Sequence, residues 1–355
     1  MDTLQSRPIG INEIPVLDFA QFDRSASAQN RLFHEMHEAC ASVGFFYIRN
    51  HGVPAAAIDD IFTQAHRFFD LPDTERDALH LTDSPWYRGY LPTGAPGANK
   101  VTRNNLLEAF NLARELGPDH PDVKALKPLH GPNQWPKEES LPGFRTSVLT
   151  YYDLMEVLSR RVLTVLSGAM GIATHDLLPK FDNQLAQLRL LYYPAQPVQD
   201  DPVLGVRAHH DTSFMTMLVQ DDAGGLEVEG RNGEWLVAPP RPDMFVVNVG
   251  SYLECLSSGI YTAAKHRVVN RSGRRRFSVP FFFSPKFEVT VEPLPHFADR
   301  PEARKVAPMN VGQDMVRFFD TLFPAVADKG GGPHDKHRTA ASRVVHRMAE
   351  GYEAA

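Results

Sequence analysis

The chain has 355 residues, of which 43% are hydrophobic and 23% are charged, so it can bury a sizeable core as one large domain or two small ones. Its formal net charge of −6 gives no electrostatic reason to expect a nucleic-acid partner. The sequence has no run of eighteen apolar residues and no charged-then-apolar leader. We therefore expect neither a membrane span nor a signal peptide, and a cytoplasmic location. The two cysteines, Cys40 and Cys255, lie in apolar contexts and are predicted to be buried free thiols.

The first third of the chain alternates between strand and helix signals. The patterns predict strands at residues 14–19 and 45–49 and helices at residues 28–42 and 55–69, the second helix ending before Pro72. Two stretches rich in proline, glycine and aromatic residues follow, at residues 81–100 and 117–142. Loops of this length inside a compact domain are commonly lids or binding loops, so we expect them to serve a functional site.

One long helix is the clearest element of the sequence. Apolar residues recur every three or four positions between Phe144 and Ala169, which indicates a stripe that faces a core and carries no ligand. From Gln187 to Val291 the pattern changes to short strands separated by turns, which favours a β-sandwich or barrel. We predict a single catalytic domain of mixed α and β structure over residues 1–325, with residues 326–355 as a C-terminal tail.

A histidine and an aspartate two positions apart give the strongest chemical signal. His209 and Asp211 lie between two apolar, strand-like runs. On a strand, side chains at i and i+2 share a face, while His210 would point to the other face. His266, from a distant segment, is the candidate third ligand. Two neutral imidazoles and one carboxylate leave a divalent metal with open positions on one side, and this set is typical of non-haem Fe(II) oxygenases.

Arg276 and Ser278 repeat the same spacing, and Arg275 is expected to face the other way. An arginine fork binds a carboxylate through two charge-assisted hydrogen bonds, and a serine hydroxyl on the same face can add a third.

A second histidine–aspartate pair with the same spacing occurs in His120-Pro121-Asp122. Its surroundings are typical of a turn, so we do not expect His120 to bind metal.

Short motifs in a fixed order add a resemblance that extends over roughly residues 12–325. They include I-P-V-L-D-F (14–19), G-F-F-Y-I-R-N-H-G-V-P (44–54), R-G-Y (88–90), N-Q-W-P (133–136), G-G-L-E-V (224–228), F-V-V-N-V-G (245–250) and M-N-V-G-Q (309–313). With these motifs and the residues above, the chain resembles the isopenicillin N synthase-like branch of the Fe(II)/2-oxoglutarate-dependent dioxygenases.

The resemblance implies a fold and a site. The fold would be a distorted double-stranded β-helix, or jelly roll, over residues 185–292, braced by the helices of an N-terminal region (12–120) and by the long central helix. Fe(II) would be held by His209, Asp211 and His266, and 2-oxoglutarate by Arg276, Ser278 and Tyr193. With O2, and with ascorbate as a reductant, such an enzyme oxidises a small organic molecule, by default through hydroxylation, and releases succinate and CO2.

Candidate substrate contacts lie on segments around these motifs. They are Trp86, Arg103, Phe110, Phe214 and Phe282. Their aromatic content favours a small organic molecule with an apolar body. We expect no nucleic-acid or membrane partner, and a monomer or a weak homodimer.

Two alternatives remain open from the sequence. In the nearer one, an oxidase resembling isopenicillin N synthase or the aminocyclopropane-carboxylate oxidases, Arg276 and Ser278 hold a substrate carboxylate or another small anion, and no 2-oxoglutarate is consumed. In the second, the chain is a jelly-roll binding protein with a structural or hydrolytic zinc. A closed zinc site would want a fourth protein ligand, and no motif supplies one.

Overall fold

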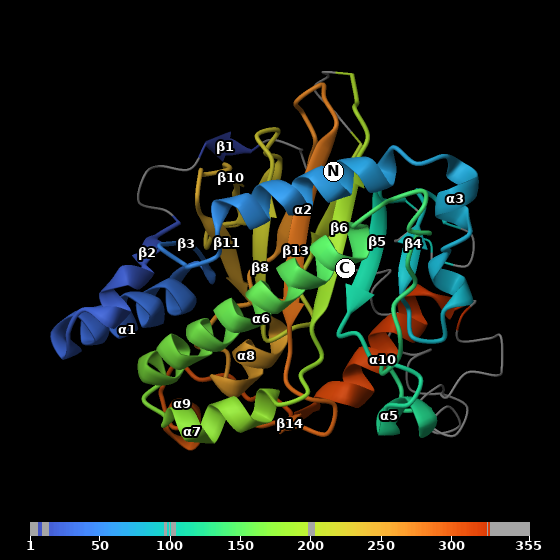
Figure 1. The fold of residues 1–355 in the computed structure, drawn as a ribbon. Coiled ribbons are helices and arrows are strands. Elements are labelled where there is room, and N and C mark those ends of the chain that lie inside the picture. Colours follow the sequence, from blue (N-terminus) through green and yellow to red (C-terminus); the bar gives the residue numbers. More distant parts are fainter. Residues whose placement is uncertain are drawn as a thin grey trace.

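The computed structural model describes residues 6–8, 14–95, 98, 100, 104–197, 203–324 and 326. Two β-sheets form its centre, and helices pack against the larger one (Figure 1). Apart from Val326, the predicted tail at 326–355 lies outside the described residues, as does Arg103. In the described ranges, no helix combines the length and the apolar character that crossing a membrane requires.

The larger sheet has eight strands in the described part of the chain. In spatial order these are β2 (Val16–Asp18), β3 (Phe45–Arg49), β11 (Phe245–Val249), β8 (Met215–Gln220), β13 (Arg276–Phe283), β6 (Gln187–Tyr193), β5 (Glu108–Ala113) and β4 (Gly89–Leu91). β2 runs parallel to β3, and the other neighbours are antiparallel. Because β13 lies between β8 and β6, side chains from distant parts of the sequence meet at the centre of this sheet.

Among the described residues, the smaller sheet has five strands. In spatial order these are β1 (Arg7–Pro8), β10 (Trp235–Ala238), β9 (Leu226–Glu229), β12 (His266–Val268) and β7 (Val206–His209). β1 runs parallel to β10, and the other neighbours are antiparallel. A separate pair is formed by β14 (Thr290–Val291) and β15 (Met309–Asn310).

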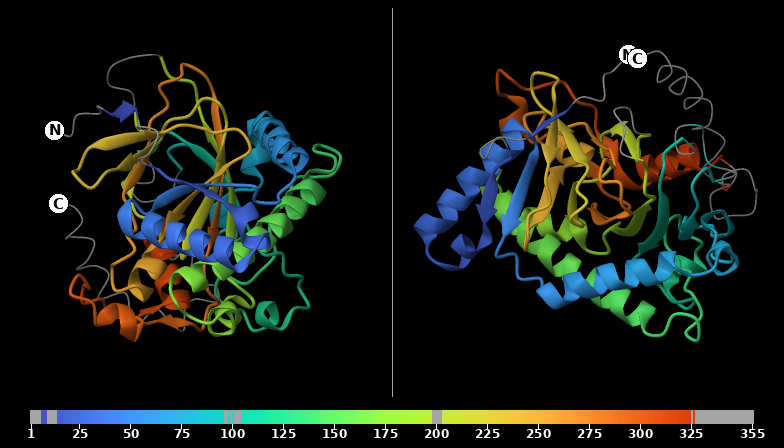
Figure 2. Two further views of the ribbon diagram at one scale, coloured as in Figure 1. Left: turned by 90° about the vertical axis from the view of Figure 1, so that its left-hand side faces the viewer. Right: turned by 90° about the horizontal axis from the view of Figure 1, so that it is seen from above.

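Three long helices, α1 (Ala26–Ser42), α2 (Ala55–Phe69) and α6 (Phe144–Ala169), lie on one side of the larger sheet (Figures 1 and 2). The shorter helices are α3 (Asp73–Asp77), α5 (Pro121–Lys124), α7 (Thr174–Leu177), α8 (Ser251–Leu256), α9 (Pro295–Ala298) and α10 (Val311–Leu322), with 3-10 turns η1 (Phe19–Asp23), η2 (Leu81–Asp83) and η3 (Leu178–Phe181). The fold is mixed α and β, with N-terminal helices and a long central helix, as the sequence predicts.

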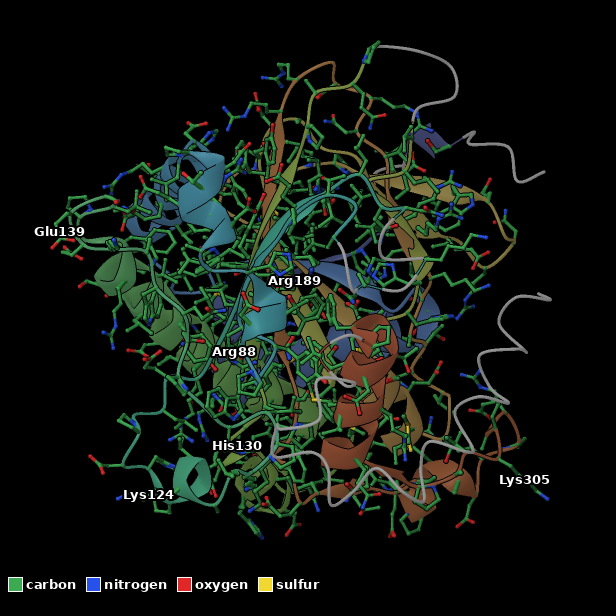
Figure 3. All side chains as sticks on the ribbon, turned by 90° about the vertical axis from the view of Figure 1, so that its right-hand side faces the viewer. Arg88, Lys124, His130, Glu139, Arg189 and Lys305 are labelled. Carbon is green, nitrogen blue, oxygen red and sulfur yellow. The ribbon has the colours of Figure 1, made fainter. Side chains whose placement is uncertain are left out.

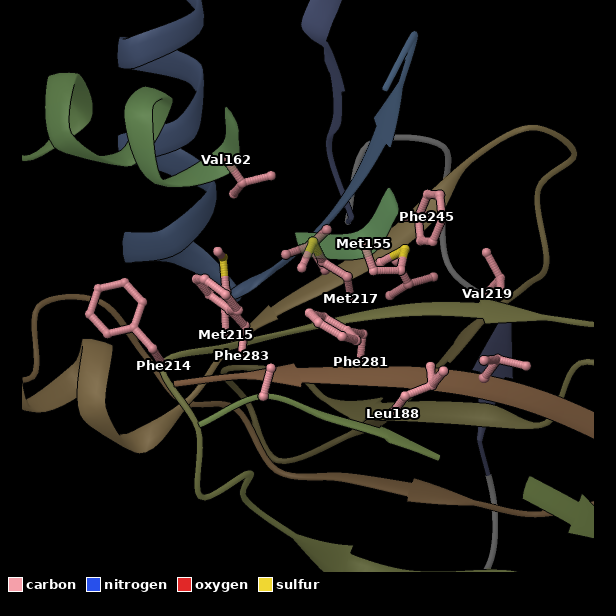
Figure 4. Packing of buried hydrophobic residues seen from close by; sticks show 14 of the residues in the cluster. Met155, Val162, Leu188, Phe214, Met215, Met217, Val219, Phe245, Phe281 and Phe283 are labelled. Carbon is pink, nitrogen blue, oxygen red and sulfur yellow. The ribbon is translucent and has the colours of Figure 1, made fainter. Parts of the chain in front are cut away.

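Side chains alternate between the two faces of the larger sheet, and this alternation separates the core from the site. On β8 and β13, Met215, Met217, Phe281 and Phe283 face α6 and are at most 1% exposed (Figure 4). The stripe on α6 that packs against them includes Met155 (Figure 4). Their neighbours on the same strands face the opposite way and line a cavity: Thr216, Leu218, Ser278, Pro280 and Phe282.

Several sequence predictions match the observed elements closely. β3, α2 and α6 have the predicted bounds. α1 begins two residues earlier than predicted because Ser25 caps it, its hydroxyl accepting a hydrogen bond from the backbone N–H of Ala28 at 3.3 Å. Cys40 and Cys255 are buried and free, as predicted.

Candidate metal centre and cosubstrate pocket

The antiparallel pairing of β7 with β12 brings two histidines together. His209, at the end of β7, lies opposite His266, at the start of β12, with ring centroids 4.2 Å apart. One carboxylate oxygen of Asp211, Oδ1, lies 3.5 Å from Nε2 of each histidine. One ligand atom from each of the three residues lies within 4.8 Å of the others. The structure therefore gathers the three residues that the sequence singles out.

The predicted strand position of Asp211 was wrong. The sequence analysis placed His209 and Asp211 on the same strand, but β7 ends at His209 and Asp211 lies beyond it, outside regular structure. The backbone of Asp211 is instead tied to the start of α8, because its carbonyl accepts a hydrogen bond from the N–H of Ser251 at 3.0 Å. His210 is not one of the three clustered residues, and its Nδ1 lies 2.5 Å from the carbonyl oxygen of Ala263.

The donor set fits a divalent cation. Nδ1 of His209 lies 2.9 Å from the carbonyl oxygen of Arg207, and Nδ1 of His266 lies 3.3 Å from that of Ala264. A proton on each Nδ1 would satisfy these carbonyls and leave both Nε2 lone pairs directed at a carboxylate oxygen. Such an arrangement repels itself unless a cation lies between the three atoms. Backbone carbonyls that fix the imidazole tautomer in this way are typical of metal-binding histidines.

The second carboxylate oxygen of Asp211 is fixed by two side chains. Oδ2 accepts hydrogen bonds from the Thr216 hydroxyl at 2.7 Å and from the Asn248 amide at 2.8 Å. Burial alone would raise the pKa of Asp211, but the facing His266 and His209 and the hydrogen bond from Thr216 hold it well below its usual value. Burial lowers the pKa of His266 to about 4. Asp211 is thus an oriented anion with one free oxygen facing the two imidazoles.

Arg276 and Ser278 lie together on β13, next to this centre. Arg276 is fully buried, its Nη1 donates to the Ser278 hydroxyl at 3.1 Å, and its Nη2 donates to Gln220 Oε1 at 3.2 Å. Its Nε donates to the carbonyl of Gly224, where a turn with φ of +69° and +90° at Gly224 and Gly225 brings the backbone close. A Cβ on Gly225 would lie 2.6 Å from a backbone oxygen, so this close approach requires glycine.

Tyr193 completes the group around the arginine. It pairs with Arg276 across β6 and β13, and the Arg276 guanidinium lies 4.5 Å from the centre of its ring. Arg275, the next residue, faces the outside and forms an ion pair with Asp70 at 2.7 Å. The predicted division between an inward Arg276 and an outward Arg275 is therefore correct.

A single cavity of about 270 Å³ connects these features. It is lined by His209, Asp211, His266, Arg276, Ser278 and Tyr193, and its apolar wall comes from α10 and the residue after it: Met315, Phe318, Phe319, Leu322 and Phe323. Cavities of this size with a few convergent polar groups are typical of small-molecule sites. The wall from α10 was not predicted from the sequence.

Four of the five predicted substrate contacts lie in the described part of the chain, and only one of these four lines the cavity. Phe282 lines the cavity. Phe110 packs in the core 4.3 Å from the ring of Phe68, and Phe214 packs 5.0 Å from that of Phe181. Trp86 covers Gly131, where a Cβ would lie 2.2 Å from the indole, and is absent from the cavity lining among the described residues. The structure therefore does not bring Trp86, Phe110 or Phe214 to the site.

Three polar residues of this site were missed by the sequence analysis. Thr216 and Asn248 hold Asp211, and Arg189 lines the cavity from β6. Asn248 lies within the F-V-V-N-V-G motif, so a signal for it was present without a role attached. His120, which was not expected to bind metal, caps α5, its Nδ1 accepting from the N–H of Asp122 at 3.2 Å, and it is not part of the cluster of His209, Asp211 and His266.

Comparison with known proteins agrees with this geometry. Residues 14–138 match the family described as the N-terminal region of non-haem dioxygenases in morphine synthesis, and residues 185–285 match the 2OG-Fe(II) oxygenase superfamily. A 2-oxoglutarate-Fe(II) type oxidoreductase of Emericella nidulans is 33% identical over 85% of this chain and 88% of its own length. A homoarginine-6-hydroxylase of Arabidopsis thaliana is 33% identical over 81% of both chains.

Solved structures give the same result. The crystal structure of a full-length Neurospora crassa protein in complex with 2-oxoglutarate and thymine has a TM-score of 0.75 and 26% identity, covering 87% of this chain and 98% of that one. This chain belongs to the Fe(II)/2-oxoglutarate-dependent dioxygenase superfamily, with the jelly-roll core that the sequence predicts. It is an oxidoreductase that uses Fe(II), 2-oxoglutarate and O2 to oxidise a small molecule.

Proposed function

We propose that His209, Asp211 and His266 hold the Fe(II), that Arg276, Ser278 and Tyr193 hold the 2-oxoglutarate, and that the chain hydroxylates its substrate. The observation that carries this assignment is the convergence of three lone-pair donors on one point beside a fully buried arginine in the same cavity. When bound, Fe(II) supplies the activation of O2 that is coupled to the oxidative decarboxylation of 2-oxoglutarate to succinate and CO2.

The residues of the chain bind and orient the reactants. Arg276 would receive the distal carboxylate of 2-oxoglutarate, and the Ser278 hydroxyl would add a hydrogen bond to the same group. Gln220 and the Gly224 carbonyl hold the guanidinium in place before the carboxylate arrives. The apolar wall from α10 limits the access of water to the reacting atoms, which protects the reaction from side paths.

The alternatives are less well supported. A closed zinc site needs a fourth protein ligand, and the cluster in the described part of the chain contains three. An oxidase that does not consume 2-oxoglutarate would bind its substrate through Arg276. In contrast, the Emericella relative is named as a 2-oxoglutarate-Fe(II) type oxidoreductase, and the Neurospora protein was crystallised with 2-oxoglutarate. The proteins similar to this chain act on or bind molecules as different as homoarginine and thymine, so they do not identify its substrate.

The remaining predictions follow from composition and sequence pattern. We propose that residues 1–325 form one catalytic domain, that the protein is a monomer or a weak homodimer, and that it is cytoplasmic.

The test of the function is stoichiometric: with Fe(II) and an accepted substrate, succinate should form in step with O2 uptake and 2-oxoglutarate loss. O2 consumption with a genuine substrate while 2-oxoglutarate stays intact would establish the oxidase instead.

A further inference from the structure

Arg189 is a cation in the cavity for which the mechanism above has no use. It lies on β6, where Arg189, Leu191 and Tyr193 line the cavity while Leu188 and Leu190 are fully buried among the core residues. In Figure 3, Arg189 is labelled near the centre of the view, whereas Lys124 and Lys305 lie at its edge. Arg189 therefore carries its charge into the cavity.

The guanidinium of Arg189, which is half-buried, has few partners in the described part of the chain. Its Nε donates to Asn111 Oδ1 at 2.8 Å, and this is its only hydrogen bond among the described residues, none of which pairs with it through a carboxylate. In contrast, Arg267 is paired with Glu227 at 2.7 Å and Arg76 with Glu108 at 2.5 Å. The two terminal nitrogens of Arg189 are thus available to a ligand.

A half-buried cation without a carboxylate partner has lost part of its hydration, and one hydrogen bond to a neutral amide replaces that hydration only in part. Burial lowers the pKa of Arg189, although Tyr193 and Asp211 act in the opposite direction. Asp211 is the only carboxylate of the cavity lining among the described residues, and it faces His209 and His266. An anion that entered the cavity beside Arg189 would supply the missing charge.

That anion is distinct from 2-oxoglutarate. β6 lies between β13 and β5 in the sheet. Arg276 projects from β13 toward Gln220 on β8, whereas Arg189 projects from β6 toward Asn111 on β5. Arg276 pairs with Tyr193, which lies about 13 Å along β6 from Arg189 at 3.3 Å per residue. The two guanidinium groups therefore lie on opposite sides of β6 and serve different ligands.

We propose that Arg189, positioned by Asn111, binds a carboxylate of the prime substrate, and that this substrate is a small organic acid with an apolar body. The proposal rests on the function proposed above. The apolar body would lie against Phe282 and the α10 wall, where Phe318 is 39% exposed although it is a large hydrophobic residue. The planar fork of an arginine matches a carboxylate, so the acid should bind far better than its amide.

The test compares two pairs of probes: 3-phenylpropanoate with 3-phenylpropanamide, and hexanoate with hexanamide. Calorimetry on the protein loaded anaerobically with Fe(II) and saturating 2-oxoglutarate keeps the Arg276 site occupied. We expect at least one acid to bind about tenfold or more tighter than its amide, the range of a charge-assisted hydrogen bond. If neither acid is preferred in the loaded parent, the proposal is wrong.

Two variants assign the preference to Arg189. Arg189→Gln removes the cation. Asn111→Asp keeps the cation but places a carboxylate against it. Because there are two variants, the role of Arg189 can be tested even if one of them fails to fold. Both should reduce the acid-to-amide preference to less than about threefold. Arg24→Gln, at an exposed residue after η1, is the matched control and should keep the full preference. A preference that survives both site variants would overturn the assignment.

The outcome is separable from that of the proposed function. Binding of 2-oxoglutarate to the Fe(II)-loaded parent is measured first and does not involve Arg189. If 2-oxoglutarate fails to bind, the proposed function fails; if it binds and no acid is preferred, only the role of Arg189 fails.

Discussion

Replacing Arg276 with lysine should weaken 2-oxoglutarate binding without affecting iron. The substitution keeps the positive charge but loses the planar fork that contacts Ser278, Gln220 and Gly224. A charge-assisted hydrogen bond contributes about 1.5–3 kcal/mol, so the loss of one corresponds to a roughly ten- to 150-fold higher Michaelis constant for 2-oxoglutarate. The Michaelis constant for the prime substrate should rise by much less, because the guanidinium contacts a different ligand.

Arg275→Lys is the matched control for this variant. Arg275 adjoins Arg276 but faces outward to Asp70, so its replacement should leave both Michaelis constants within about twofold, as for exposed ion pairs. The assay measures succinate formation across a 2-oxoglutarate series, with Fe(II) affinity determined separately by anaerobic titration. An equal rise for 2-oxoglutarate and substrate, or an equal effect of Arg275→Lys, would refute the assignment of Arg276.

Three further predictions follow from the site and the core. Asn248→Ala removes a hydrogen bond to Asp211 and should lower Fe(II) affinity about ten- to 100-fold in anaerobic titration; an unchanged affinity would show that Asn248 does not orient the ligand. Phe110→Ala should cost about 3–5 kcal/mol of unfolding free energy by chemical denaturation, because the ring is fully buried against Phe68. At a temperature where this variant is folded, its Michaelis constant for substrate should match the parent, and a selective rise would restore Phe110 as a substrate contact. Fe(II) affinity should fall as the pH drops through the pKa of His209, because the imidazole must release its proton before it can bind the metal. The hydrogen bond with Asp211 raises this pKa above 6.5 despite burial. An affinity that stays constant between about pH 8 and 6 would contradict this prediction.

Local periodicity predicted the elements that are long or strongly patterned. α6 and α2 each carry a stripe of apolar residues, and both were predicted with the observed bounds. The clustering of His209, Asp211 and His266 was also predictable, because the residue types and their order limit the chemistry. The strand geometry expected for Asp211 was wrong, since a turn held by the backbone of Ser251 replaces the end of the strand.

The substrate side of the cavity was poorly predicted for a physical reason. Both faces of β5 are buried, so its sequence does not show which face meets the helices. Phe110 was chosen, but it faces the core, and its neighbour Asn111 faces the cavity and holds Arg189. Contacts between distant strands decide such cases. The α10 wall shows the same limit, because its residues meet the strands of the cavity only through long-range packing.

Anaerobic Fe(II) titration of four single variants tests the central claim most directly. His209→Ala, Asp211→Ala and His266→Ala should each bind iron severely more weakly than the parent, because each removes one of three converging ligands. His210→Ala should bind iron like the parent, because its ring is directed at the Ala263 carbonyl. Parent-like binding by His266→Ala together with loss of iron in His210→Ala would contradict the metal centre described above.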